Sequence, residues 1–359
     1  MRPVYPEQGR DEWITAQRPP RNALDPFRPH GFFLEPERSG SGRIASSAVI
    51  LLTNRECPWR CLMCDLWKNT LPYKVPPGAI PAQIEYALDR VSASPEQIKL
   101  YNSGSFFDTA AIPVEDYPQI AEKVSFAERV IVESHPHLVG KRAIAFRDQL
   151  IGAQSSSSAR RYAPGEKVCR TERKRCAPQL EVAMGLETVH PDILPRLNKN
   201  LDSDDFLFAA STLYHFGITL RVFVLIKPPF MHESLAVEWA IKSAEFAFVC
   251  CLASVVSLIP TRAGNGAMER LIENDEFAPP YLYTVEKALE ECLARFCTSR
   301  RSSASEARLQ RRVFVDTWNL EQFSRCPHCF EERRLRLCQM NLTQEILPAI
   351  SCSFCKGLM

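Results

Sequence analysis

The sequence predicts an α/β fold with a mainly parallel sheet, and three observations lead to that prediction. Six short aliphatic and β-branched runs alternate with stretches of helical periodicity, the pattern of strands joined by crossover helices. The chain has 359 residues, enough to bury one large core or two moderate ones. Three closely spaced cysteines follow the first of these runs, at the carboxyl end of a strand, where parallel α/β folds bind their ligands.

The elements follow from these runs. We expect strands at residues 48–53, 97–102, 129–133, 179–185, 219–226 and 255–259, and helices at 82–92, 114–127, 202–216 and 235–248. Residues 1–43 are rich in proline and arginine without sustained periodicity, which indicates an N-terminal extension. We expect the strand-rich domain to cover residues 44–298 and a basic, cysteine-rich C-terminal module to cover 299–359.

Composition excludes some classes of protein. The formal net charge is +2, so no general basic excess announces a nucleic-acid partner and any such role must depend on local patches. The chain starts without an apolar signal core, and its longest apolar stretch, residues 246–259, is too short to span a bilayer. We therefore expect a cytoplasmic protein without membrane association. In a reducing compartment, its clustered cysteines favour metal binding over disulfides.

The first cysteine group consists of Cys57, Cys61 and Cys64, in the order CPWRCLMC. Thiolates bind iron-sulfur clusters, and three ligands on one short loop can hold three corners of a four-iron cube while the fourth iron stays open to a ligand. A zinc knuckle and three unrelated buried thiols are the alternatives. The tight spacing directly after a strand favours the cluster.

This C-x3-C-x2-C spacing resembles the radical S-adenosylmethionine (radical SAM) superfamily. The resemblance implies a partial (β/α)6 TIM-like barrel, a 4Fe-4S cluster whose open iron chelates SAM, and an electron donor such as ferredoxin or flavodoxin. In that family the reduced cluster cleaves SAM to a 5'-deoxyadenosyl radical, which the protein shields. Met63 stands where the family usually has an aromatic residue, and we expect it to pack against the adenine.

The same resemblance implies further contacts to SAM. Ser103, Gly104 and Ser105 follow the second predicted strand, where family members carry a glycine-rich segment that contacts the SAM amino group. Glu187, at the end of the fourth strand, would bind the ribose, and Arg196 the carboxylate. An ordinary Ser-Gly loop and a solvated helix start are the structural alternatives.

Several segments narrow the resemblance to one family. The runs CLMCDLWKNT, NSGSFFD, VESHP, EVAMGLET and FVDTWNLEQFSRCPHC resemble the archaeosine-biosynthesis radical SAM proteins, which are related to the catalytic subunit of Elongator and to tRNA methylthiotransferases. In that family a partner synthase attaches lysine to a deazaguanine base in tRNA, and the radical enzyme cleaves the adduct. The resemblance therefore implies tRNA and a partner synthase. A radical SAM enzyme acting on a small metabolite or a protein, and a non-catalytic metal-binding protein, are the alternatives.

A basic insertion is expected at residues 152–178, with the sequence SSSSARRYAPGEKVCRTERKRCAP at its centre. Clustered Arg and Lys on a long polar connection can contact RNA phosphates, or can simply be solvated.

The second cysteine group lies near the C-terminus. Cys326 and Cys329 form one C-x2-C pair, and Cys352 and Cys355 form another. Two such pairs are typical of a four-thiolate zinc site of the zinc-ribbon kind, and an auxiliary iron-sulfur cluster is the alternative. His328 and Cys338 could substitute as ligands, and arginines at 333, 334 and 336 suggest contact with nucleic acid.

Overall fold

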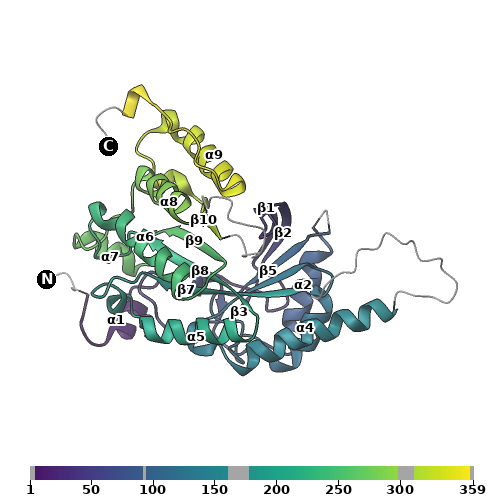
Figure 1. The fold of residues 1–359 in the computed structure, drawn as a ribbon. Helices are drawn as coiled ribbons and strands as arrows, with labels where there is room; N and C mark the ends of the chain where they lie inside the picture. Colours follow the sequence, from purple (N-terminus) through teal and green to yellow (C-terminus); the bar gives the residue numbers. More distant parts are fainter. Residues whose placement is uncertain (1–4, 92–93, 161–177, 298–310, 356–359) are drawn as a thin grey trace.

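The computed structural model describes residues 5–91, 94–160, 178–297 and 311–355 (Figure 1). Its centre is an eight-stranded sheet with the order β1-β2-β5-β6-β7-β8-β9-β10. All neighbouring strands from β2 to β10 are parallel, and β1 pairs antiparallel with β2. The strands are β1 (Gly31–Arg38), β2 (Ile44–Leu51), β5 (Gln97–Tyr101), β6 (Arg129–Glu133), β7 (Gln179–Glu187), β8 (Thr219–Ile226), β9 (Val255–Pro260) and β10 (Arg312–Val315).

Helices lie along the outer face of the sheet (Figure 1), where they contact β1, β2 and β7 to β10. Alternate strand residues such as Val130, Val132 and Val222 pack under them in one large core. The helices are α1 (Arg10–Ala16), α2 (Ala79–Leu88), α3 (Tyr117–Val124), α4 (Lys141–Arg160), α5 (Ser203–His215), α6 (Glu233–Val249), α7 (Ala267–Glu273), α8 (Leu282–Phe296) and α9 (Pro327–Thr343).

The sheet curls so strongly that strands far apart in its order touch. Arg221 of β8 donates hydrogen bonds to both carboxylate oxygens of Glu37 on β1, at 3.1 and 2.7 Å. At the two sheet edges, Arg312 Nη1 of β10 donates to the Arg38 carbonyl of β1 at 3.0 Å. The rings of Phe33 and Trp318 also meet across this seam, 5.1 Å apart. The sheet is therefore a parallel half-barrel whose edges are joined through side chains.

The predicted α/β fold is confirmed. All six predicted strands occur, as β2 and β5 to β9, and the four predicted helices appear as α2, α3, α5 and α6. Strands β1 and β10 were not predicted, because Pro36 and three charged residues interrupt the first and the second is only four residues long. These two strands lie on the far sides of the proposed domain boundaries at 43 and 299, so one sheet runs across both boundaries.

The predicted basic insertion begins within a helix. The first nine residues of the predicted basic insertion continue α4 as far as Arg160, and residues 161–177 lie outside the described part of the chain. None of the helices within the described ranges is both long enough and apolar enough to cross a membrane.

Candidate functional site

The first cysteine group lies on a loop after β2, at the carboxyl end of the half-barrel. A two-stranded ladder closes the base of the loop, with β3 (Asn54–Arg55) parallel to β4 (Thr70–Leu71). Three amide contacts hold the loop from outside. Leu62 N donates to the Leu197 carbonyl at 2.9 Å, and Asn265 Nδ2 donates to the carbonyls of Leu62 and Cys64 at 2.8 and 3.1 Å. The loop is thus fixed against the segments that follow β7 and β9.

Burial governs the chemistry of the three thiols. It raises the pKa of Cys57, Cys61 and Cys64 to about 12 each, and the neighbouring thiols act on one another. The Lys199 charge opposes this rise at Cys57 and Cys61. Because a metal must displace the thiol protons, a bound cation would supply the charge that stabilises the thiolates here.

The glycine-rich turn after β5 touches this loop. A side chain at Gly104 would bring its Cβ to 3.2 Å from Cys57 Cβ, so glycine lets the two segments approach closely without a shift. Ser105 Oγ lies 2.9 Å from Ser134 Oγ, which ties the turn to the loop after β6. Asn102, at the start of the turn, is fully buried, and neither polar atom of its side-chain amide has a protein partner. A buried amide in this position suits a bound polar ligand.

Glu187 lies at an irregular end of β7. The pairing with β8 shifts register between Gly185 and Glu187, and Glu187 has a left-handed backbone with φ 66°. Its carboxylate forms an ion pair with Lys199, whose side chain is 9% exposed. A side chain at Gly185 would overlap both partners. The charges of Glu187 and Lys199 both act on the Cys61 thiol, so the predicted residue Glu187 lies near the cysteine loop. Its partner Lys199 was not predicted.

Arg196 and Met63 lie together beside Phe230. The Arg196 guanidinium is 3.3 Å from the centre of the Phe230 ring, and its Nη2 is 3.4 Å from Glu276 Oε1. Met63 is partly buried and, like Phe230, packs against two small apolar clusters of buried side chains. These contacts give Arg196 one acidic partner and leave its side chain 39% exposed.

A stacked pair of rings beside the cysteine loop was not predicted from the sequence. The Trp59 and His135 rings are 3.6 Å apart and nearly parallel, at 8°. His135 Nε2 is 3.1 Å from the Lys199 carbonyl. Burial, with Lys199 nearby, lowers the pKa of His135 to about 3. The ring is therefore neutral, and its Nε2–H donates to that carbonyl. In the sequence, the signal for His135 as a site residue was its position just after a predicted strand.

Glu133 is a second residue near the site to which the sequence analysis gave no role. It ends β6, and its Oε2 accepts a hydrogen bond from Asn102 N at 3.1 Å. Burial raises its pKa to about 7, so near neutral pH this carboxyl can hold or release a proton.

The second cysteine group forms a compact site. Cys326 precedes α9 and Cys329 lies in its first turn, while Cys355 ends a short 3-10 turn after Cys352. The Sγ atoms of Cys329 and Cys355 are 3.4 Å apart, and those of Cys326 and Cys352 are 4.0 Å apart. All four sulfur atoms lie within 4.8 Å of one another. The pairs are carried by a helix and a 3-10 turn rather than by the β-hairpins of a zinc ribbon.

The arginines beside this site are mostly buried. Arg333 Nε donates to Cys329 Sγ at 3.2 Å, and its guanidinium pairs with Glu286 of α8. Arg336 pairs with Glu286 and Glu290. These two arginines join α9 to α8 and do not form a surface for nucleic acid.

A parallel half-barrel with a C-x3-C-x2-C loop at the carboxyl end of its first parallel strand is the arrangement that the resemblance to the radical SAM superfamily predicts. Two archaeal relatives are named archaeosine synthase subunit beta. The one from Methanosarcina acetivorans is 25% identical over 71% of this chain and 69% of the relative, and the one from Thermococcus kodakarensis is 24% identical over 67% and 68%. The predicted resemblance to the archaeosine-biosynthesis family is thereby confirmed. No family model matches the chain.

Solved structures resemble the chain more distantly. Elp3 from Methanocaldococcus infernus, with its N-terminus deleted, is 13% identical over 74% of this chain and 59% of its own, with a TM-score of 0.44. Methylornithine synthase is 11% identical over 73% of this chain and 62% of its own, with a TM-score of 0.43. The chain thus spans about three fifths of each of these structures.

Proposed function

We propose that this protein is a radical SAM enzyme that modifies a base in tRNA, with archaeosine-like deazaguanine chemistry. The observation that supports it best is the half-buried loop of Cys57, Cys61 and Cys64 at the carboxyl mouth of a parallel half-barrel. A 4Fe-4S cluster on these thiols, with SAM on its open iron, would supply the radical.

The protein residues have roles in holding the cofactor. Gly104 lets the turn from Ser103 to Ser105 approach the cysteine loop, where backbone groups would meet the SAM amino group. Glu187, held by Lys199, would bind the ribose. Arg196 would bind the SAM carboxylate, and Met63 would pack against the adenine.

We propose zinc at the second cysteine group. A zinc ion with four sulfur ligands at about 2.3 Å in a tetrahedron sets its sulfurs about 3.8 Å apart. The sulfur separations of 3.4 and 4.0 Å suit one such ion. A four-iron cube between the thiolates would need more room than this cluster has.

The names of the relatives support the proposed partners. A protein named as a subunit beta implies a partner subunit, and the name archaeosine synthase implies tRNA. We include both in the proposal, together with an electron donor of the ferredoxin or flavodoxin type.

The deciding experiment is mass spectrometry of tRNA nucleosides from cells with the gene, without it, and with Cys61→Ala. The expected result is one modified nucleoside that disappears in cells without the gene and in cells with Cys61→Ala. The reconstituted Cys61→Ala protein should also lose iron and 5'-deoxyadenosine formation while keeping zinc, because the four C-terminal cysteines are separate. Identical nucleosides in all three strains would exclude tRNA as the substrate, and continued 5'-deoxyadenosine formation by the variant would exclude this cluster site.

A further inference from the structure

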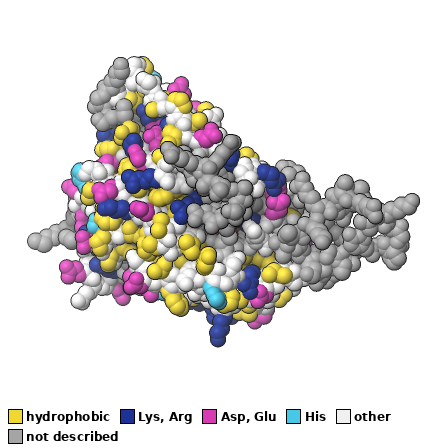
Figure 2. Space-filling model, viewed as in Figure 1, with side chains coloured by type: hydrophobic (Ala, Val, Ile, Leu, Met, Phe, Trp, Pro, Cys, Tyr) yellow, Lys and Arg dark blue, Asp and Glu magenta, His cyan; other side chains and the backbone are white. Residues whose placement is uncertain are grey.

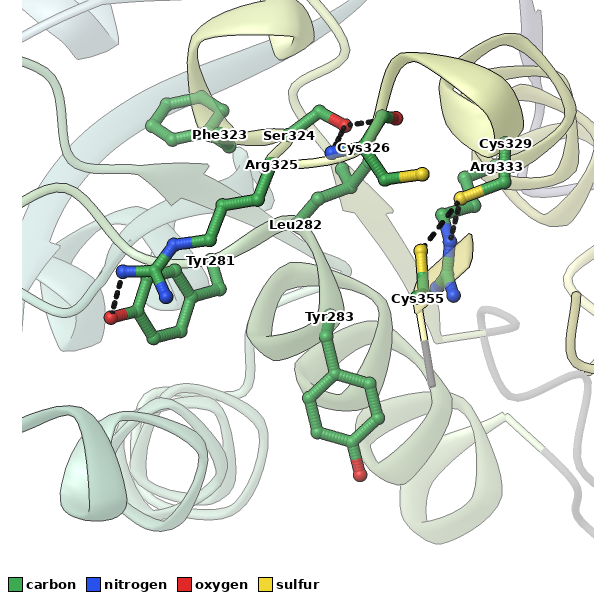
Figure 3. Close-up of a pocket in the computed structure, with 10 residues that line it drawn as sticks. All are labelled: Tyr281, Leu282, Tyr283, Phe323, Ser324, Arg325, Cys326, Cys329, Arg333 and Cys355. Atoms are coloured by element: carbon green, nitrogen blue, oxygen red, sulfur yellow. Dashed lines mark hydrogen bonds between the residues drawn. The ribbon is translucent and has the colours of Figure 1, made fainter. Parts of the chain in front are cut away.

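A hollow lies beside the second cysteine group, at the start of α8 (Figure 3). Its lining includes the aromatic residues Tyr281, Tyr283 and Phe323, together with Arg325 and the sulfur side of the cysteine site. Tyr281 and Tyr283 are 37% and 49% exposed. Exposed aromatic side chains that gather on one surface are a common feature of binding sites.

The planar side chains at and beside the hollow are held by stacking on one another. The Arg325 guanidinium lies 3.8 Å from the centre of the Tyr281 ring and donates to the Tyr281 hydroxyl (Figure 3). Beside the cysteines, the rings of His328 and Phe354 stack 3.9 Å apart at 17°, and Phe354 is 64% exposed. Each pair presents a planar group that is already ordered, so stacking on it costs little conformational entropy.

The hollow adjoins the mouth of the half-barrel. Lys227 follows β8 at the carboxyl end of the sheet, and its Nζ lies 6.0 Å from the centre of the Tyr281 ring. Lys227 also pairs with Glu233 at 2.6 Å, and Glu233 accepts a hydrogen bond from Tyr281 N at 3.1 Å. The segment from Lys227 to Phe230 then leads to the side chains beside Met63. A ligand in the hollow is therefore next to the face where the cysteine loop lies.

The arginines of α9 do not make the surface around the hollow basic. Arg333 and Arg336 are buried in pairs with Glu286, and Arg334 pairs with Glu331. On the face shown in Figure 2, basic and acidic side chains are interspersed rather than gathered by sign. The side chains exposed at the hollow are the aromatic rings of Tyr281 and Tyr283 and the guanidinium plane of Arg325.

We propose that this hollow binds a base of single-stranded RNA by stacking, next to the nucleotide that enters the half-barrel. Proteins recognise unpaired RNA bases by stacking them on aromatic rings and on arginine planes, the two groups that meet here. The inference rests on the proposed function, since it assumes a tRNA substrate. It gives the C-terminal module a role in substrate binding that does not use phosphate contacts.

The test is tRNA binding by the zinc-loaded full-length protein at several salt concentrations, with unmodified tRNA as the probe. Tyr283→Ala and Arg325→Lys should each weaken binding by about tenfold, because each removes a stacking plane. Arg325→Lys keeps the charge, so the salt dependence should stay that of the wild type. Tyr214→Ala is the matched control, since Tyr214 is 66% exposed on α5, and it should bind as the wild type does. Zinc content and thermal unfolding verify that each variant is folded.

The outcomes separate the two levels of the proposal. If the wild type does not bind tRNA, the tRNA substrate itself is wrong and the hollow loses its ligand with it. If the wild type binds and Tyr283→Ala binds equally well, the stacking site alone is wrong. If Arg325→Lys binds like the wild type while Arg325→Ala binds weakly with a smaller salt slope, the contact is to a phosphate and stacking is overturned. If the variants keep tRNA but lose a purified partner subunit, the hollow is a protein interface.

Discussion

At the scale of single residues, the site depends on buried charges that are matched in pairs. Glu187 and Lys199 illustrate this, because both side chains are about nine-tenths buried and each is the other's ion-pair partner. Removing one partner of a buried pair leaves the other charge without compensation, which costs far more than losing an exposed pair.

We therefore expect Lys199→Ala to lower the free energy of unfolding of the cofactor-free protein by about 3–5 kcal/mol. Urea denaturation measures this change. The matched control is Lys242→Ala, which breaks an exposed pair with Glu238 and should cost about 0–1 kcal/mol. Equal losses in the two variants would contradict a buried, matched pair at Lys199.

At the scale of elements, the second cysteine group joins α9 to a turn near the C-terminus. Cys326 and Cys329 lie at the start of α9, and the other two cysteines lie past its end. A metal here would close a loop of the chain, while α9 also packs on its own through the buried residues Leu337 and Met340. The helix therefore has two sources of stability, and metal binding can be tested by substitution without removing the helix.

Cys355→Ala should abolish zinc binding and leave the iron of the first cysteine group unchanged. Four thiolates are needed to complete a structural zinc site, and the first group is a separate loop. Metal analysis of the reconstituted protein gives both contents. Cys338→Ala is the control, since Cys338 is not in the four-sulfur group, and it should keep its zinc. A loss of about four irons in Cys355→Ala would instead indicate an auxiliary cluster.

At the scale of the whole molecule, a buried charge network fills the amino end of the half-barrel. Arg129, Glu181 and Arg221 link β6, β7 and β8, and Glu37 carries the network across to β1. Burial by itself would raise the pKa of both glutamates. At Glu37, the charges of Arg221 and Lys99 outweigh the effect of burial, so its pKa falls well below the usual range. At Glu181, the charges of Arg221 and Arg129 outweigh it, and the pKa falls to about 2.

Both carboxyls have lower pKa values in the folded protein than in the unfolded chain, where a glutamate titrates at about 4.3. Their stabilising effect is therefore complete above that pH and is lost as the pH falls toward about 2. We expect the free energy of unfolding to drop across this window, and to drop less steeply in Glu181→Gln.

Urea denaturation at a series of pH values measures both slopes. Glu238→Gln, at an exposed pair, should retain the slope of the wild type. An unchanged slope in Glu181→Gln would mean that this carboxyl does not titrate in the window.

The sequence alone determined the features that depend on local pattern. The period of the apolar residues located β2 and β5 to β9, and the spacing of cysteines marked both thiol groups, since neither feature needs knowledge of distant segments. The tertiary structure alone decided which distant residues meet. It paired Lys199 with Glu187, stacked Trp59 on His135 and brought β1 to β10, because curling the sheet brings together residues as distant in the sequence as Arg38 and Arg312, which are 274 positions apart. It also turned Arg333 and Arg336 inward to Glu286, where two guanidinium groups share one buried carboxylate, an arrangement that sequence spacing could not distinguish from a basic surface.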